Sequence, residues 1–392
     1  MNADLPVLDP RAPGFSTRGP EVREARARHW AARTPWGLAV LRHREAGLLL
    51  RDRRLRQGSH AWPDQVGLTG PFADFWRRSL IGHVGPEHRA LKYAAMAALT
   101  QEHVEALEPA FKHIAATLCA ALPEGESVEF MGRFAKPYAG QVICALLAID
   151  GERWPQVAED AIALGLAMGI DAARHAVRID DAYLRLDALA AELLARGRDG
   201  IDTHGYVARL AALDGFDDTT LRDLVVISIF GGVDTTRAQL GLGLLLFDAH
   251  PEQWTLIRQN PDRIPAAVEE MIRQRPTTTW ATREALEEFS FGGVTIPKGT
   301  TLHLYVHAGG CDPALGGPAG FDAAADRKRH FGFGGGAHHC LGAHMARCDI
   351  GVALRALSAR FATVALAGKP DLLPDSGNTG PVHLPVRFGA AR

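Results

Sequence analysis

Apolar and polar residues alternate with the period of an amphipathic helix over much of the middle of the chain. This stretch, from about residue 100 to residue 215, is rich in alanine and leucine. It predicts helices over residues 104–122, 137–149, 154–164 and 179–195. The apolar pattern breaks around Gly169, so we expect an interruption between the last two of these helices, over residues 166–178.

The longest apolar helix pattern runs from Asp217 to Ala249, with Asp218 or Thr219 as the expected N-cap. At about 1.5 Å per residue, such a helix would be roughly 45 Å long and could cross a whole domain. Its middle, residues 231–236, carries two glycines, an aspartate and two threonines. Glycine inside a helix costs about 1 kcal/mol relative to alanine, but it leaves room on one face.

Strand patterns are short and lie towards the two ends of the chain. A charged helix is expected over residues 20–32, followed by short apolar segments at 37–41 and 47–50. Residues 55–85 read as irregular and aromatic, and residues 289–299 read as a hairpin with a Gly-Gly turn. A last helix to about residue 357 and a β tail complete a fold that we expect to be mainly α with small β-sheets.

Composition and charge indicate a single globular domain. The 392 residues are 47% hydrophobic and 22% charged, without a linker or repeat, so we expect a single domain over 1–392 with an extended segment at 1–19. The net charge of -2 favours neither nucleic acid nor membrane. Five scattered cysteines and a polar start without a signal or membrane span favour a cytoplasmic location, and we expect a monomer.

A glycine-rich loop, residues 333–342, presents a single thiol, that of Cys340, just before a helical pattern. Glycines allow the backbone to approach a flat ligand closely, and a following helix N-terminus favours a thiolate. Haem iron is a planar partner that uses an axial cysteine thiolate. Two other interpretations stay open. Cys340 could be a buried small apolar residue, or it could bind zinc with His344 and Cys348, which follow at i+4 and i+8.

The loop resembles the haem-binding signature of the cytochromes P-450, F-G-x-G-x-H-x-C-x-G, with every fixed position met. The resemblance implies the cytochrome P-450 fold, with haem b held between the long central helix and the cysteine loop. It implies that Cys340 is the iron ligand, that Phe333 shields the sulfur and that His338 binds a haem propionate.

Two further segments resemble the propionate-binding motifs of that family. His88 and Lys92 stand at i, i+4 and match D-P-P-x-H-x-x-x-R, except that Lys92 replaces the arginine. Because lysine lacks the two-pronged guanidinium of arginine, its contact with the propionate would be looser or water-mediated. Arg283 precedes Gly292-Gly293, as the family's propionate-binding arginine does. A solvated basic helix face and a surface arginine at a strand end remain alternatives.

Two more motifs follow the family's order along the chain. Residues 231–236 resemble [A/G]-G-x-[D/E]-T-T, in which Asp234 and Thr235 would relay protons during oxygen activation. Without such a role, a buried unpaired Asp234 would be costly, whereas the threonines could simply bond to carbonyls one turn earlier. Glu270 and Arg273 resemble the structural E-x-x-R pair behind the haem, but Gly320 stands where its usual arginine partner would be.

The resemblance implies monooxygenation of a small organic molecule with O2 and two electrons. The chain is too short to include a reductase as well, so ferredoxin and ferredoxin reductase would supply the electrons. The composition indicates a bacterium, and the function that the resemblance implies would belong to its specialised metabolism. The alternative is a haem-thiolate enzyme for oxidative aromatic coupling or cross-linking of a peptide. Ferredoxin could dock on basic residues, although a solvated surface explains these equally well: Arg89, Lys92, Arg327, Lys328, Arg329 and Arg347.

The substrate would be a bulky or aromatic-bearing small molecule or a peptide. We expect its pocket to be lined by Trp76, Gly231, Thr278, Trp280 and Thr379. Trp280 is large for its position, so it would narrow the pocket or stack on the substrate.

Overall fold

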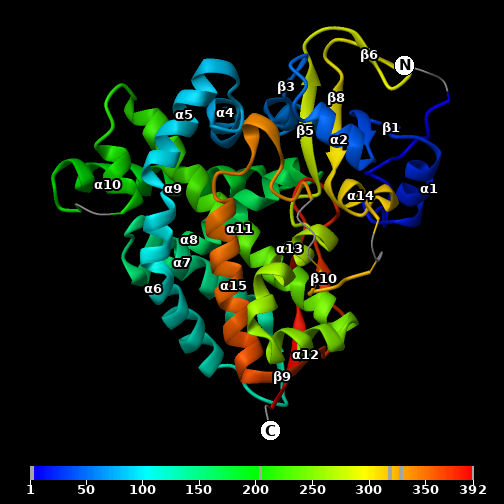
Figure 1. Cartoon of the computed structure of the whole chain (residues 1–392). Coiled ribbons are helices and arrows are strands. Elements are labelled where there is room, and N and C mark those ends of the chain that lie inside the picture. Colours follow the sequence, from blue (N-terminus) through cyan, green and yellow to red (C-terminus); the bar gives the residue numbers. More distant parts are fainter. Residues whose placement is uncertain (1–3, 203–204, 317–319, 326–329, 391–392) are drawn as a thin grey trace.

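The fold is known from a computed structural model, which describes residues 4–202, 205–316, 320–325 and 330–390. Helices form the larger part of the body, and the small sheets lie along one side of it and at its lower end (Figure 1). The helices are α1 Pro20–Arg28, α2 His43–Leu49, α3 Trp62–Gln65, α4 Pro71–Arg78, α5 Gly85–Ala98, α6 Gln101–Ala120, α7 Lys136–Leu147, α8 Trp154–Gly165, α9 Ala176–Arg198, α10 Tyr206–Ala211, α11 Asp218–Ala249, α12 Pro251–Gln259, α13 Ile264–Gln274, α14 Val306–Gly310 and α15 Ala343–Arg360.

The strands form one larger sheet and several small ones. The larger sheet has the order β1-β2-β8-β5-β3, in which β2 and β8 are parallel and the other neighbours are antiparallel. A second sheet has the order β4-β12-β9, and β6-β7 and β10-β11 are two-stranded. The strands are β1 Ala31–Thr34, β2 Gly37–Val40, β3 Leu55–Gln57, β4 Ser127–Glu129, β5 Trp280–Ala285, β6 Phe289–Phe291, β7 Val294–Ile296, β8 Thr301–Tyr305, β9 Phe361–Leu366, β10 Asp371–Leu372, β11 Pro381–His383 and β12 Pro385–Ala390. The mainly α fold class with small sheets is therefore confirmed.

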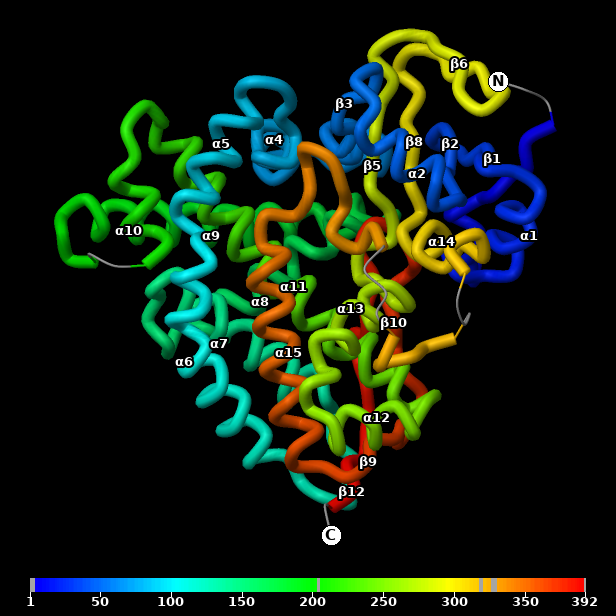
Figure 2. The backbone as a smooth tube through the Cα atoms, in the orientation of Figure 1, coloured from blue at the N-terminus to red at the C-terminus, as the bar shows by residue number. Residues whose placement is uncertain are grey.

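Helix α11 is the central element that the sequence predicted. Helices α7, α8, α9 and α15 pack against it, and Figure 2 shows its tube running through the body behind α15. Its N-cap is Asp217, whose carboxylate accepts the amide of Thr220 at 2.7 Å, so the expected N-caps Asp218 and Thr219 were wrong by one or two residues. The backbone of Asp217 is extended, and the helix begins only after it.

The helices of the body were predicted within a few residues. The expected break around Gly169 is confirmed, because the α-helical course ends at Gly165 and short 3-10 turns lead to α9. The hairpin β6-β7 is confirmed as well: Gly292 and Gly293 have φ of +54° and +80°, values that favour glycine. No helix in the described part of the chain is long and apolar enough to span a bilayer.

The first eighty residues contain the main errors of the sequence prediction. The expected helix over residues 20–32 ends at Arg28, and Ala31 and Ala32 pair with β2 instead. The apolar segment 47–50 lies mainly in α2, and the stretch 55–85, expected to be irregular, contains β3, α3 and α4. Tertiary packing explains α4: its aromatic residues at helical spacing face the core, and Phe72 and Phe75 are fully buried there.

Candidate functional site

The loop before α15 holds Cys340 by backbone contacts. The amide of Cys340 donates to the carbonyl oxygen of Phe333 at 2.8 Å, which closes the loop on itself. Gly334 and Gly336 have φ of +67° and +68°, and a Cβ on Gly336 would lie 2.5 Å from the carbonyl oxygen of Leu50. The positive φ expected from the sequence is confirmed at both glycines, and Gly336 is required also by its close packing against Leu50. The expected close approach to a flat ligand stays a prediction.

The thiol of Cys340 is reachable by solvent-sized molecules, yet much protein surrounds it. This burial raises the thiol pKa, while a hydrogen bond from the amide of Gly342 and the positive charges of Lys92 and Arg347 lower it. The guanidinium carbon of Arg347 also lies 4.4 Å from the ring centre of Phe333. Burial is the largest of these effects, so the thiol pKa lies above its ordinary value, while the amide and the two cations are the groups that favour a thiolate.

The middle of α11 leaves open space beside Gly231. Gly231 is exposed, and a Cβ added there would meet no atom within 4 Å. One turn later, the partly exposed Thr235 donates its hydroxyl hydrogen bond to the carbonyl oxygen of Gly231, the back-bond expected from the sequence. Helix α15 packs on α11, so the thiol of Cys340 before α15 and the open space at Gly231 belong to neighbouring elements. This arrangement fits a flat iron-containing cofactor.

The four residues predicted to bind propionates converge on the cysteine loop. The rings of His88 and His338 lie 3.8 Å apart, centre to centre. Burial lowers the pKa of His88 to about 4 and that of His338 to about 3. Arg283 is buried and donates to the carbonyl oxygens of Leu50 at 3.2 Å and Gly335 at 3.0 Å. Hydrogen-bond donors thus gather in one place, as binding of two carboxylates requires.

Lys92 makes contacts that the sequence did not predict. Its ammonium donates to the carbonyl oxygens of Ala337 at 2.6 Å and His339 at 3.0 Å, one on each side of His338. The lysine therefore fastens α5 to the cysteine loop. Its role towards a propionate stays a prediction.

Asp234 is buried but has a partner. Its Oδ1 accepts from Nη2 of Arg237 at 3.0 Å, and both residues are at most 5% exposed. A Cβ on Gly165 would lie 2.5 Å from Oδ2 of Asp234, so this carboxylate packs against α8. Sequence analysis did not name Arg237, although its i+3 spacing from Asp234 was visible.

Thr236 and Asp349 form a second polar contact that sequence analysis missed. The hydroxyl of Thr236 donates to Oδ2 of Asp349 on α15 at 3.1 Å, rather than to its own helix. Both residues are buried. Burial raises the pKa of Asp349 to about 8, against the opposing hydrogen bonds from Thr236 and the amide of Ile350. No motif links the two residues, because they are 113 positions apart.

Glu270 and Arg273 form a buried ion pair, 0% and 4% exposed, with two N–O distances of 2.6 Å. Arg273 also donates to the carbonyl oxygen of Gly320 at 3.4 Å, and Glu270 accepts the amide of Asp322 at 3.2 Å. Backbone groups of residues 320 and 322 therefore contact the pair where a third side chain was expected.

The predicted pocket residues lie in different surroundings. Trp76 is buried and donates its indole N–H to the carbonyl oxygen of Ser59 at 2.9 Å. The hydroxyl of Thr278 bonds to Asn378 at 3.2 Å, and the amide of Thr379 donates to Thr277 at 2.7 Å. The tip around residue 379 thus reaches back to the segment before β5. The pocket roles of Trp76, Thr278, Thr379 and the exposed Gly231 stay predictions.

Trp280 is buried in an aromatic cluster. Its ring stacks on that of Tyr305 at 5.8 Å between centres, and its other ring neighbours are Trp36, Trp62 and His303. These contacts take up much of the ring, so the expected contact of Trp280 with a substrate also stays a prediction.

The alternative zinc site lacks support among the described residues. Helix α15 begins at Ala343, after Cys340, so Cys340, His344 and Cys348 do not share one helix. No group of three histidine, cysteine or acidic residues in the described ranges is arranged to hold a metal ion.

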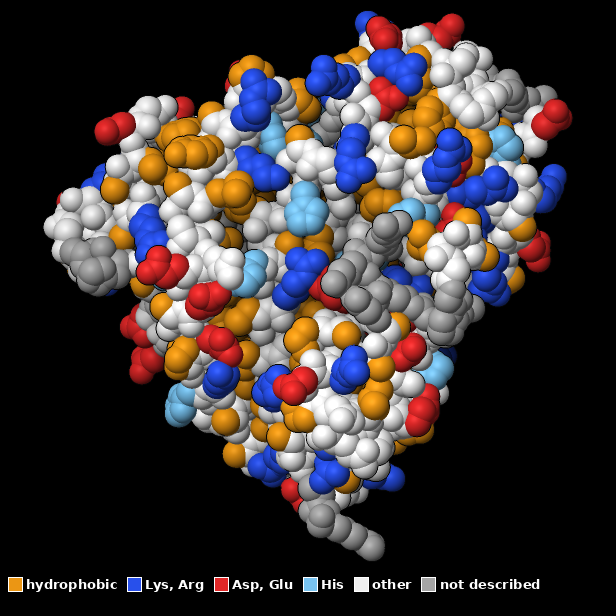
Figure 3. Space-filling model, in the orientation of Figure 1, with side chains coloured by type: hydrophobic (Ala, Val, Ile, Leu, Met, Phe, Trp, Pro, Cys, Tyr) orange, Lys and Arg blue, Asp and Glu red, His pale blue; other side chains and the backbone are white. Residues whose placement is uncertain are grey.

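Charged residues near the site include some of those expected to dock a ferredoxin. Figure 3 shows Lys, Arg and His side chains around the start of α15. Arg89 is exposed, whereas Arg347 is tied to Glu269, with Nη2 and Oε2 3.0 Å apart. Arg327, Lys328 and Arg329 lie outside the described residues.

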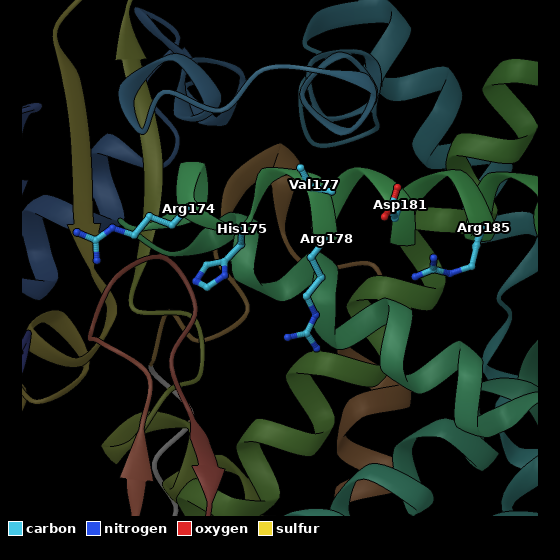
Figure 4. Close-up of a pocket in the computed structure, with 6 residues that line it drawn as sticks. All are labelled: Arg174, His175, Val177, Arg178, Asp181 and Arg185. Atoms are coloured by element: carbon cyan, nitrogen blue, oxygen red, sulfur yellow. The ribbon is translucent and has the colours of Figure 1, made fainter.

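A surface hollow on α9 is separate from this site. It is lined by charged side chains from the start of α9 and the turn before it, including Arg174, Arg178 and Asp181 (Figure 4). Arg178 is paired with Glu159 at 3.0 Å. None of the predicted site residues lines this hollow.

Comparison with known proteins gives a consistent result. The sequence model of the family "Cytochrome P450" matches residues 185–385. Luteothin monooxygenase of Streptomyces thioluteus is 38% identical, over 99% of this chain and 97% of that protein. The 6-deoxyerythronolide B hydroxylase of Saccharopolyspora erythraea is 32% identical, over 83% of this chain and 82% of the hydroxylase.

Solved structures agree on the fold. A mutant of P450 EryK in complex with erythromycin B is 26% identical, with a TM-score of 0.82 over 94% of this chain and 95% of EryK. Cytochrome P450 CYP109Q5 from Chondromyces apiculatus is 22% identical, with a TM-score of 0.87 over 99% of each chain, a likeness of fold alone.

Proposed function

This chain belongs to the cytochrome P450 family and is a haem-dependent monooxygenase, and we propose that it binds haem b through the thiolate of Cys340. The observation that carries the proposal is the surroundings of that sulfur: a glycine-rich loop, the amide of Gly342 and two cations. When bound, the haem supplies the activation of O2 with two external electrons.

The residues of the chain would hold the cofactor from several sides. His88, His338 and Arg283 would donate to the propionates, since they already meet beside the cysteine loop. Lys92 would act mainly by fastening that loop, because its ammonium bonds to two loop carbonyls. Phe333 would cover the sulfur and limit access of water, which tunes the ligand through burial.

A reduced sample treated with carbon monoxide tests the haem-thiolate assignment directly. We expect the red-shifted Soret band that a thiolate ligand produces. A band at the position typical of a histidine-ligated haem, or a purified protein that takes up no haem, would rule the assignment out.

Thr235 and Asp234 would handle protons in the reaction. The Thr235 hydroxyl, on the same face as the exposed Gly231, would hold and pass a proton at Oγ1. The Asp234 carboxylate, one position earlier, would replenish it from water. The resemblance of the motif and the positions of the two side chains on α11 support these separate roles for Thr235 and Asp234.

Removal of the Thr235 hydroxyl is expected to divert electrons to peroxide. In Thr235→Ala, the hydrogen peroxide released per NADH oxidised should rise severalfold, because proton transfer contributes about 10² or more to such a step. The assay needs only O2 and the electron donors. Thr219→Ala, at the exposed start of the same helix, serves as the matched control. Unchanged peroxide in Thr235→Ala would count against the relay role.

Cytochromes P450 require electron-transfer partners, and we propose a ferredoxin with its ferredoxin reductase. The exposed Arg89 beside the cysteine loop would attract an acidic donor protein, and reduction should slow as salt rises. We also propose a cytoplasmic location, where such donors are available. All five cysteines are free, as is usual in a reducing compartment.

The substrate is proposed to be a bulky organic molecule of bacterial specialised metabolism. Relatives named as a luteothin monooxygenase and a 6-deoxyerythronolide B hydroxylase support this class. Both names describe insertion of oxygen, which is the reaction we assign. Screening the compounds named with these relatives, luteothin and 6-deoxyerythronolide B, and analogues of them for a Soret shift of the ferric protein would identify binders.

A further inference from the structure

The buried pair of Asp234 and Arg237 differs in its surroundings from Gly231 and Thr235 on the same helix. Gly231 is exposed and Thr235 is partly exposed, whereas Asp234 and Arg237, which are neighbours at i, i+3, are both buried. Asp234 is 3% exposed and Arg237 is 5% exposed, with Oδ1 and Nη2 3.0 Å apart. The acid is therefore buried in an ion pair with an arginine of its own helix.

Arg237 has a second contact, outside α11. Its Nη1 donates to the carbonyl oxygen of Pro381, the first residue of β11, at 3.0 Å. The two elements pack closely here, because a Cβ on Gly380 would lie 2.5 Å from the Cβ of Ala238. A Cβ on Gly241 would lie 2.9 Å from Pro381. Arg237 thus bridges the acid and a backbone segment whose distance from α11 is tightly set.

The segment before β11, residues 376–381, also contacts two regions around the predicted pocket. The amide of Ile170, in the interruption between α8 and α9, donates to the hydroxyl of Ser376 at 3.2 Å. On the other side, the amide of Thr379 donates to Thr277 at 2.7 Å. Both regions are therefore hydrogen-bonded to the segment that ends at Pro381, the residue whose carbonyl accepts from Arg237.

We propose that Arg237 is a positioning residue for proton delivery. It keeps the Asp234 carboxylate against α8 and ties its position to the segment 376–381. No bond of Arg237 is made or broken, since it acts only by charge and hydrogen bonding. This inference rests on the proposed proton-handling role of Asp234 and Thr235, and it adds a residue that the family motif does not contain.

A double-mutant cycle of Asp234→Asn and Arg237→Met tests the inference on the haem-loaded protein, with O2 as the probe. Each single variant should slow NADH-driven O2 consumption about tenfold and raise its solvent isotope effect. If Arg237 acts through Asp234, the double variant should be no slower than Asp234→Asn alone. Arg237→Lys, which keeps the charge, should recover most of the rate.

Hydrogen exchange supplies a readout that does not depend on turnover. In Arg237→Met, amide exchange over residues 376–383 should become severalfold faster, because the tie to Pro381 is lost. Arg222→Met is the matched control: Arg222 lies on the same helix and pairs with Asp187 at 2.9 Å, but both are partly exposed. It should alter neither the exchange nor the O2 consumption.

The outcomes separate the two proposals. Normal O2 consumption in Asp234→Asn would refute the relay role itself. A slow Asp234→Asn beside a normal Arg237→Met would refute only the positioning role. Additive losses in the double variant would also refute it, because Arg237 would then act independently of the acid. If Arg237→Met does not fold, Arg237→Gln, which also removes the charge, takes its place in the cycle: a rate equal to that of Asp234→Asn supports the positioning role, and a wild-type rate refutes it.

Discussion

Cys340→Ser is expected to abolish the red-shifted Soret band of the reduced carbon monoxide complex, together with all monooxygenase activity. A serine hydroxyl stays protonated at neutral pH and does not replace a thiolate as an iron ligand. The substitution leaves the loop intact, because the bond that closes it runs from the amide of residue 340 to the carbonyl of Phe333. Loss of the band would therefore report on the ligand and not on the backbone.

Cys348→Ser provides the matched control for this experiment. Cys348 lies further along α15, is partly buried, and has its thiol pKa raised to about 11 by burial. It should retain the band and the activity. Haem content and far-ultraviolet circular dichroism measured on both variants distinguish a lost ligand from a lost fold. A thiolate-type band that persists in Cys340→Ser would show that another residue binds the iron.

Arg273→Met is expected to destabilise the protein by about 3–5 kcal/mol, the range for removing one partner of a buried ion pair. Glu270 is fully buried, and without Arg273 its carboxylate would lack its strongest partner. The expected result is a large fall in the free energy of unfolding, or a low yield of folded protein that holds haem. Urea unfolding followed by circular dichroism and by Soret absorbance measures both effects.

Arg77→Met is the control for Arg273→Met, because it removes one partner of an ion pair with the same i, i+3 spacing at the surface. Arg77 and Asp74 are also i, i+3, with a distance of 3.1 Å, and Arg77 pairs with Asp64 as well, at 2.8 Å. Both acids are exposed and Arg77 is partly exposed, so the loss should be about 1 kcal/mol or less. Removing both charges, in Glu270→Gln with Arg273→Met, should recover part of the stability. Equal effects of Arg273→Met and Arg77→Met would contradict the structural role of the buried pair.

Local chemistry explains what was predicted well from the sequence. The cysteine loop follows from glycines whose positive φ no other residue adopts easily, as at Gly334 and Gly336. The long helix follows from a mostly apolar pattern over more than thirty positions, as a mostly buried helix shows. The errors of the secondary-structure prediction lie mainly where short helices and strands alternate, as around Ala31 and α4. An element of only a few residues shows little hydrophobic periodicity.

The sequence indicated the ion pairs of the candidate site only as possible pairs. Asp234 and Arg237 stand three residues apart, but most pairs at this spacing are solvated, and only their burial makes the pair significant. The same holds for Glu270 and Arg273. Their spacing was visible from the sequence, while the backbone groups of Gly320 and Asp322 that contact them were not.

By itself, the sequence determined the family, the thiol that is the expected ligand and the order of the helices, since each depends on residue type and short-range spacing. Only the tertiary structure decided which distant groups complete the site. Lys92 bonds to a carbonyl 245 residues away, Arg237 to one 144 residues away, and Thr236 to an acid 113 residues away. Such partners are selected by the packing of helices and by the need of buried polar groups for hydrogen bonds, and neither leaves a periodic trace along the chain.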